Sequence, residues 1–191
     1  YYHPLLVLMG GCLIGVFVAL DFFMFYVFWE LTLVPMFFLI LNWGGKERKY
    51  AAQKFFIYTF TASVLMLLGI ITLYLIQEPS TANASITGRS FNMEKMIQNA
   101  QEAVILDKIW LGAGTQKLLF VLFMAGFLVK LPVVPFHTWL PDAHVQAPTG
   151  GSMLLAGVML KMGAYGMFRI PISMFPHALV EFQIPLMIIG M

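Results

Sequence analysis

Hydrophobic residues fill this chain in long blocks that are separated by short polar stretches. A helix needs about 20 apolar residues to cross the hydrocarbon core of a bilayer. By this measure the blocks predict membrane-spanning helices at about 5–20, 22–42, 51–76, 117–139 and 151–170, with the start of another near His177. We therefore expect an all-α, polytopic transmembrane helix bundle.

The polar stretches predict the loops and the sides of the membrane on which they lie. Residues 46–49, Lys-Glu-Arg-Lys, form the densest charge cluster, and a short basic loop favours the cytoplasmic side. The 141–148 turn would then also be cytoplasmic, and the long 77–116 loop would lie on the opposite side. Within that loop, 93–110 has the pattern of a short amphipathic helix along the membrane surface.

The composition supports a membrane protein and argues against other classes. Of the 191 residues, 60% are hydrophobic and 10% are charged, and the mean hydropathy is +0.85, whereas soluble domains carry about 25% charged residues. A net charge of +2, with no Lys/Arg patch interleaved with aromatics, argues against nucleic-acid binding. The single cysteine, Cys12, excludes an internal disulfide. Because the chain lacks an initial Met and ends within an apolar run, we expect a fragment of a longer protein.

Three ionisable residues fall near the centres of predicted spans: Glu30, Lys130 and Lys161. A charge at that depth is costly and is by default a functional-site hypothesis. Because Glu30 and Lys130 have opposite signs and similar predicted depths, we expect them to pair, with Lys161 as a second cation nearby. The alternative is a purely structural role in a buried salt bridge. The helix of Lys161 also carries small residues that allow tight packing: Gly157, Gly163, Ala164 and Gly166.

Two other lysines, Lys54 and Lys117, fall at the ends of predicted spans. A long lysine side chain in that position can cover apolar surface with its stem and keep its ammonium group in the interface. We therefore expect both to snorkel and assign them no chemistry.

Prolines interrupt the helices close to the central charges. Pro35 follows the acidic residue by five positions and loosens the turn beyond it. Pro132 and Pro135 are expected to free the carbonyl groups of Leu128 and Leu131, on either side of the central lysine. Helices break at membrane depth where freed carbonyls face a cavity, water or an ion. The proline pair therefore predicts a functional break.

Two histidines follow Lys130 at intervals of seven residues, His137 and His144. The three side chains would share one face if the helix continued through the prolines. Neutral imidazole can accept a proton on one nitrogen while the other donates one. The series therefore predicts a proton relay, with capping of the turn as an equal alternative for His144. No carboxylate or cysteine stands at ligand spacing from the histidines, so a metal site is not expected.

The sequence around these residues resembles a known family. The run 130–144 reads Lys-Leu-Pro-Val-Val-Pro-Phe-His-Thr-Trp-Leu-Pro-Asp-Ala-His, and 146–152 reads Gln-Ala-Pro-Thr-Gly-Gly-Ser. The run 160–166 reads Leu-Lys-Met-Gly-Ala-Tyr-Gly, and the acidic segment 28–35 reads Phe-Trp-Glu-Leu-Thr-Leu-Val-Pro. These motifs resemble the antiporter-like membrane subunits of respiratory complex I, and most of all the chain M group, called chain 4 in mitochondria.

The resemblance implies a fold and a set of site residues. The fold would be a proton channel of two inverted repeats of about five helices, each with a broken helix. Residues 1–170 would form the first antiporter-like repeat, and 171–191 would begin the second. Lys161 would be the central lysine that passes protons toward the second half-channel. The residues implied in proton translocation are Glu30, Lys130, Lys161, His137 and His144.

The resemblance also implies a function, that of a proton-translocating subunit of NADH:quinone oxidoreductase. Protons would move through a half-channel of buried Glu, Lys and His residues, coupled to quinone reduction elsewhere in the complex. The partners would be the other membrane subunits, including neighbouring antiporter-like chains, in the bacterial inner membrane or the equivalent mitochondrial or thylakoid membrane.

No redox cofactor is expected in this chain. It has no cysteine cluster, haem-type histidine pair or Gly-rich nucleotide turn, so NADH, FMN, iron–sulfur clusters and quinone would bind elsewhere in the complex. Two alternative functions stay open. One is a component of a multisubunit cation/proton antiporter, and the other is a purely structural membrane anchor.

Overall fold

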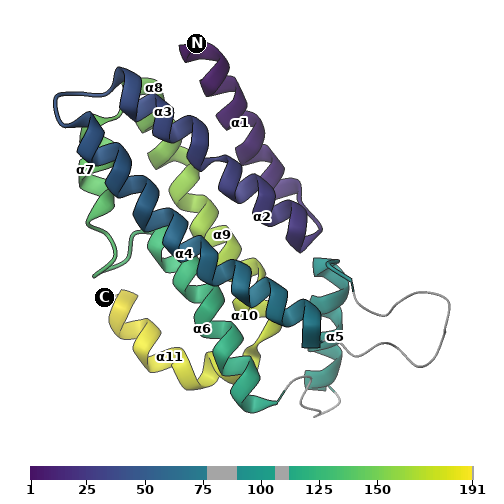
Figure 1. Ribbon diagram of the computed structural model, residues 1–191. Helices are drawn as coiled ribbons and strands as arrows, with labels where there is room; N and C mark the ends of the chain where they lie inside the picture. Colours follow the sequence, from purple (N-terminus) through teal and green to yellow (C-terminus); the bar gives the residue numbers. More distant parts are fainter. Residues whose placement is uncertain (77–89, 106–111, 191) are drawn as a thin grey trace.

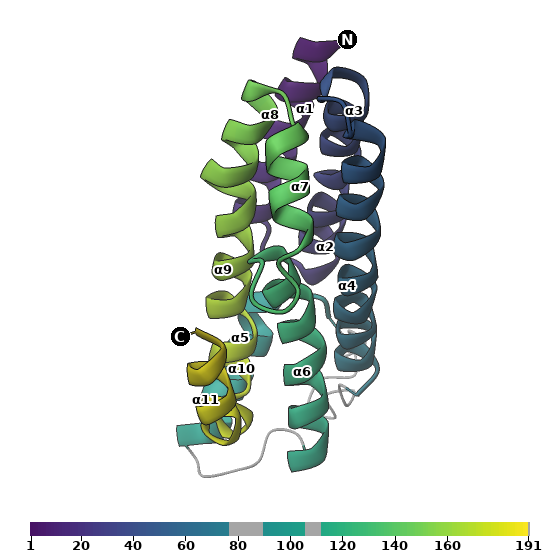
Figure 2. The ribbon, with the colours of Figure 1, turned by 90° about the vertical axis from the view of Figure 1, so that its left-hand side faces the viewer.

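Apolar helices lie side by side along one axis of the molecule (Figures 1 and 2). The structure is a computed structural model that describes residues 1–76, 90–105 and 112–190. The described residues form helices and no strand, apart from an isolated antiparallel bridge between Asp21 and Asn92. The predicted all-α class is confirmed.

Several of these helices have the length and apolar character of membrane spans. Within the described residues, three stretches are long and apolar enough to cross a membrane, Phe22–Trp43, Arg48–Ile76 and Thr149–Met174. Two shorter apolar helices, Tyr2–Val18 and Pro176–Gly190, lie at the two ends of the chain. The predicted polytopic bundle agrees with this pattern.

Asp21 separates the first two predicted spans. Helix α1 (Tyr2–Val18) ends just before it, and helix α2 (Phe22–Leu31) begins just after it. The Asp21 carboxylate accepts hydrogen bonds from the backbone N–H groups of Phe23 at 2.8 Å and Met24 at 3.3 Å. An acidic N-cap satisfies donors that a helix start otherwise leaves unpaired. The first charge in the sequence therefore marks the turn because it caps the next helix.

The second predicted span consists of two helices, α2 and α3 (Leu33–Trp43), that meet at Thr32. Pro35 lies in the first turn of α3, where a helix needs no N–H donor. The Thr32 hydroxyl donates to the carbonyl of Trp29 at 2.7 Å. The predicted interruption beyond the acidic residue is confirmed.

Helix α4 (Arg48–Ile76) is the third span, and α5 (Met93–Ile105) lies within the predicted long loop. In α5, Met93 and Met96 are buried against the bundle. The predicted amphipathic helix is therefore confirmed over 93–105, while 77–89 and 106–111 of the loop lie outside the described residues. Its position along the membrane surface stays a prediction.

The fourth span is a broken rod, with α6 (Ala113–Lys130), an irregular segment at 131–138 and α7 (Trp139–Gln146). Figure 2 shows α6 in the lower half of the bundle, the irregular segment near its middle and α7 above. The predicted break is confirmed, but the predicted end at 139 and turn at 141–148 are wrong. Pro141 lies in the first turn of α7, where it is compatible with a helix, so the rod continues to Gln146.

The fifth span runs through α8 (Thr149–Leu154), a π-helical turn η1 (Leu155–Met159) and α9 (Leu160–Arg169). Helices α10 (Pro171–Met174) and α11 (Pro176–Gly190) follow. The predicted turn at 171–176 is therefore wrong in part, because Pro171 starts a short helix at its first position.

Helix α9 packs closely against the C-terminal end of α6, beside the break in the fourth span. A Cβ atom on Gly163 would lie 3.0 Å from the backbone nitrogen of Leu131 and 3.1 Å from the carbonyl oxygen of Phe127. A Cβ atom on Gly166 would overlap the Phe127 ring. Two of the predicted small residues therefore do allow tight packing, and they place α9 directly against the end of α6.

Candidate functional site

Lys130 is the last residue of α6 and is 2% exposed. Its Nζ atom is buried and has no hydrogen-bond partner among the described residues. The group lies over the ring of Trp29 at 5.6 Å and over the ring of Phe55 at 5.8 Å. The carbonyl end of a helix carries a partial negative charge, so the end of α6 favours the ammonium group. A buried lysine therefore lies at the break in the fourth span.

Glu30 lies at the junction of α2 and α3, one residue before the end of α2. It interacts electrostatically with Lys130, and its carboxyl group also interacts with the side chains of Tyr26 and Ser63. One carboxylate oxygen, Oε1, is buried and has no hydrogen-bond partner among the described residues. The predicted pairing of Glu30 with Lys130 is therefore supported as an electrostatic one. In the described chain the two do not form a direct ion pair.

One of the two carbonyl groups that were predicted to be free, that of Leu128, is hydrogen-bonded. The carbonyl of Leu128 accepts from the N–H of Val133 at 3.0 Å, so it is not freed. The carbonyl of Val129 accepts from Nε1 of Trp139 at 2.9 Å. The chain re-satisfies these groups within the break because an unpaired carbonyl is costly in a buried site. The expectation of a free Leu128 carbonyl was wrong.

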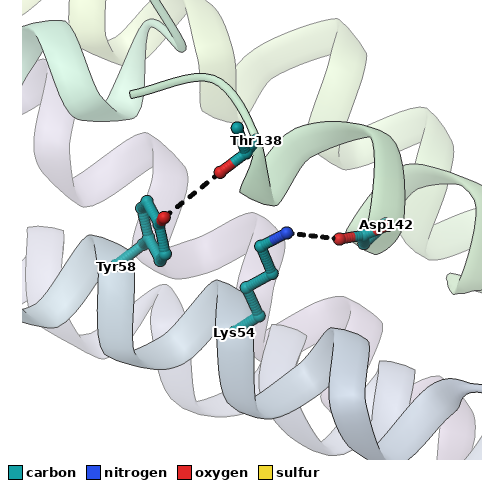
Figure 3. Close-up of polar contacts among 4 residues, drawn as sticks. All are labelled: Lys54, Tyr58, Thr138 and Asp142. Atoms are coloured by element: carbon teal, nitrogen blue, oxygen red, sulfur yellow. Dashed lines mark hydrogen bonds and ion pairs between the residues drawn. The ribbon is translucent and has the colours of Figure 1, made fainter. Parts of the chain in front are cut away.

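Two polar contacts hold the second half of the broken rod against α4 (Figure 3). Lys54 forms an ion pair with Asp142 at 2.7 Å, and Thr138 donates a hydrogen bond to the hydroxyl of Tyr58 at 3.2 Å. We call these four residues the α4–α7 clamp. Lys54 is therefore a partner of α7 and not simply a snorkelling residue. Lys117 is likewise paired, with Glu181 of α11 at 2.7 Å.

The end of α7 is bonded to the turn between α3 and α4. The N–H of Gly45 donates to the carbonyl of Gln146 at 3.0 Å, and the N–H of Glu47 donates to the side-chain oxygen of Gln146 at 3.2 Å. The turn between α3 and α4 and the C-terminal end of α7 therefore lie at the same end of the bundle, as the predicted topology requires. The cytoplasmic assignment of that end stays a prediction.

The two histidines lie in different environments. His137 is half-buried in the irregular segment, and its Nδ1 atom is buried without a hydrogen-bond partner in the described chain. His144 is exposed in the last turn of α7, where its carbonyl accepts from the hydroxyl of Ser152 at 3.0 Å. The seven-residue spacing does not place Lys130 and these histidines on one face, because α6 ends at Lys130.

Lys161 lies at the level of the break, since Gly163, two residues later, packs on Leu131 and Phe127. It follows the π-helical turn η1, and such turns are frequent at functional sites. Its side chain is exposed on the surface of the described chain, outside the cluster of Glu30 and Lys130. The structure therefore brings together two of the predicted proton-carrying residues and places Lys161 beside them on an outer face.

Comparison with known proteins identifies the family. A family model described as "NADH:quinone oxidoreductase/Mrp antiporter, TM" matches residues 19–191. The chain belongs to this family. It is a multi-pass membrane protein, as the family description and its apolar helices show.

Among curated members of the NADH:quinone oxidoreductase/Mrp antiporter family, two relatives illustrate the similarity. NADH-quinone oxidoreductase subunit M of Rhodobacter capsulatus is 51% identical over 164 residues, which are 86% of this chain and 30% of that protein. F(420)H(2) dehydrogenase subunit M of Methanosarcina mazei is 45% identical over 193 residues, which are 100% of this chain and 35% of that protein. The chain thus spans about a third of the length of these relatives.

A solved structure gives the same family likeness. A chain of respiratory complex I from Thermus thermophilus with bound NADH matches with a TM-score of 0.82 and 28% sequence identity. The match covers 98% of this chain and 36% of that chain. The arrangement of the described helices therefore matches that of part of a chain of respiratory complex I.

Sequence reasoning missed the aromatic and polar neighbours of the site. Trp29 and Phe55 face the buried lysine, and Lys54 with Asp142 forms the ion pair of the α4–α7 clamp. Trp29 stands next to the acidic residue in sequence, which was an available signal. Phe55 carried no signal, because it is one of many aromatic residues in an apolar span.

Replacing Asp142 with Asn should weaken the attachment of α7 to α4 by a small amount. The side chains of the pair are 19% and 39% exposed, and partly exposed ion pairs contribute about 0.2–1 kcal/mol. In a double-mutant cycle of D142N with Lys54→Met, monitored by thermal unfolding of the full-length protein, we expect a coupling energy of that size. Glu181→Gln, which breaks the other ion pair, should show no coupling with Lys54→Met. Purely additive effects of D142N and Lys54→Met would contradict the clamp.

Proposed function

We propose that this chain is part of a proton-translocating membrane subunit of an NADH:quinone oxidoreductase of the complex I type. The observation that carries the proposal is the oppositely charged pair of half-buried Glu30 and buried Lys130 at two helix interruptions. Membership of the family and the 51% identity to a subunit M support the same function. Redox chemistry would belong to other subunits, and this chain would supply proton transfer.

The geometry suggests how the pair could work. Glu30 and Lys130 interact across a buried region, where Coulomb interactions are stronger than in water. The charge on one residue therefore changes the free energy of protonating the other. Movement of either helix end would change that interaction and could drive uptake or release of a proton. Both residues lie at helix interruptions, Lys130 at the end of α6 and Glu30 at the junction of α2 and α3.

His137 and Lys161 would extend the path beyond the pair. His137 offers a buried ring nitrogen within the irregular segment that follows Lys130. Lys161 lies at the same level on α9, on the exposed outer face of the described chain. We assign His144 the weaker role of a residue at the end of the path, because it is exposed in the last turn of α7.

The proposal includes partners and a compartment. The chain would assemble with the other membrane subunits of complex I, including neighbouring antiporter-like chains, in a bacterial inner membrane or its mitochondrial or thylakoid equivalent. Relatives named for NADH-quinone and for F(420)H(2) dehydrogenases are 51% and 45% identical to this chain. The electron donor would therefore be determined by other subunits of the assembly.

The alternative of a cation/proton antiporter subunit makes a different prediction for ion dependence. In proteoliposomes with the complete complex and its full-length subunits, electron transfer should drive proton uptake when choline replaces sodium and potassium. A requirement for sodium or potassium, with transport that persists without electron transfer, would instead support the antiporter.

Replacing Lys161 with Ala tests the remaining alternative, a structural anchor. We expect proton uptake per electron to fall severalfold in the same proteoliposomes, because a cation on the path would be lost. Lys95→Ala, which removes an exposed lysine of α5, is the matched control and should transport normally. Normal coupling in assembled K161A complex would favour an anchor or a path that avoids this lysine.

A further inference from the structure

The ammonium group of Lys130 has an unusual set of neighbours. Its Nζ atom is buried and has no hydrogen-bond acceptor in the described chain, and Glu30 acts on it without forming a direct ion pair. A buried ammonium group without acceptors loses its hydration and gains little in return. The carbonyl end of α6 and the charge on Glu30 favour the cation without a hydrogen bond to Nζ, and a direct interaction with the ammonium group would add to them.

Two aromatic rings provide that interaction. The Nζ atom lies over the ring of Trp29 at 5.6 Å and over the ring of Phe55 at 5.8 Å. Both distances are within the range of about 6 Å over which a cation is attracted to the face of a ring. The rings come from different helices, Trp29 from α2 and Phe55 from α4, so the cation is contacted from two sides of the bundle.

Both rings are held in place by their own contacts. Trp29 is 1% exposed and packs edge-on against Phe127, with ring centroids 5.4 Å apart. Phe55 is fully buried and packs against Trp139, also with centroids 5.4 Å apart. These contacts restrict the positions that each ring can adopt beside the lysine.

We propose that Trp29 and Phe55 form an aromatic cage that positions the Lys130 ammonium group and stabilises it independently of Glu30. The inference rests on the proposed proton-translocating function and adds two positioning residues to it. The negative face of a ring attracts a cation but gives almost nothing to a neutral amine. The cage thus distinguishes the protonated from the deprotonated lysine without adding a second ionisable group that could itself take the proton.

The cage also connects the lysine to the second half of the broken rod. Phe55 contacts Trp139, and Trp139 donates to the carbonyl of Val129, the residue before the lysine. A displacement of α7 would therefore act on both the ring and the backbone beside Lys130. In this arrangement a change in the position of α7 would also change how strongly the rings stabilise the Lys130 ammonium group.

Graded fluorination of Phe55 tests the cage without changing the shape of the core. Phenylalanine with one, two or three ring fluorines is introduced at Phe55 of the full-length subunit in the assembled complex, and proton uptake per electron is measured in proteoliposomes. Each fluorine weakens the negative ring face, so we expect coupling to fall stepwise, by about tenfold in total for a desolvated contact. The same series at Phe22, which is buried in α2 and does not face the lysine, should leave coupling unchanged.

A second pair of variants uses rescue by a conservative change. Trp29→Phe keeps a ring face over the lysine and should retain much of the proton uptake per electron. Trp29→Leu removes that face and should lower proton uptake per electron about as much as three fluorines on Phe55 do. The cage would be disproved if proton uptake per electron did not change with fluorination of Phe55, or if it changed equally with fluorination of Phe55 and of Phe22. Lys130→Met is measured in parallel to separate the two proposals. If fluorination of Phe55 and Lys130→Met both leave coupling unchanged, the proposed function is wrong. If Lys130→Met abolishes coupling and fluorination of Phe55 does not change it, the function stands and the cage is wrong.

Discussion

Replacing Lys130 with Met is expected to abolish proton translocation by the assembled complex and leave the complex intact. Methionine keeps an unbranched chain of similar length in the buried site, but it has no charge and no proton to transfer. Methionine removes the desolvation cost of the ammonium group but leaves Glu30 without its oppositely charged partner, so we expect some loss of stability with assembly retained. The measurement is proton uptake per electron in proteoliposomes, together with assembly on a native gel.

The control for K130M is Lys117→Met, at the far end of α6. Lys117 forms an ion pair with Glu181 and its side chain is 43% exposed, so its loss should leave transport nearly normal. Glu30→Gln should resemble K130M, and the double variant should be no worse than either single one, because both changes remove the same interaction. Near-normal proton uptake in assembled K130M complex would contradict the mechanism.

Replacing Gly166 with Leu should cause a large loss of stability. A side chain at this position would overlap the Phe127 ring. That ring packs on Trp29 with centroids 5.4 Å apart and on Phe123 with centroids 6.4 Å apart, so it has little room to move. Overpacking a rigid core costs about 1–3 kcal/mol and sometimes more. We expect a lower unfolding temperature for the full-length protein and a reduced yield of assembled complex.

The control for G166L is Gly114→Leu near the start of α6. A Cβ atom on Gly114 would meet nothing within 4 Å, so the same substitution should be accepted there. Equal effects of the two substitutions would show that α9 does not depend on contact with the Phe127 ring. Loss of stability at Gly166 alone would confirm that the small residues of α9 keep it close to the break.

The spans and the break were predictable because their signals are local. Apolar blocks define the helices, Asp21 caps α2 through its own side chain, and two closely spaced prolines stop α6. The end of the broken rod was not predictable by the same rule. Pro141 was expected to end a helix, but in the first turn of α7 it leaves no hydrogen bond unmade.

The neighbours of the central lysine depend on contacts that are distant in sequence. Glu30 could be proposed as a partner because charge and depth are visible in the chain. Phe55 and Trp139 could not be, because only the packing of α4 against α7 selects them from many similar rings. The same holds for Lys54, whose pairing with Asp142 joins residues 88 positions apart. Sequence thus predicts which residues are unusual, and packing decides which ordinary residues surround them.

The two glycines that join α3 to α4 restrict how the length of that turn can vary. A Cβ atom on Gly44 would lie 2.8 Å from the Gln146 carbonyl oxygen, and one on Gly45 would overlap the Gln146 side chain. Surface loops usually accept insertions because few of their backbone groups are hydrogen-bonded to the rest of the protein. Here the N–H groups of Gly45 and Glu47 are both bonded to Gln146. An extra residue would therefore detach the tip of α7, so among related chains this loop should vary in its charges far more readily than in its length.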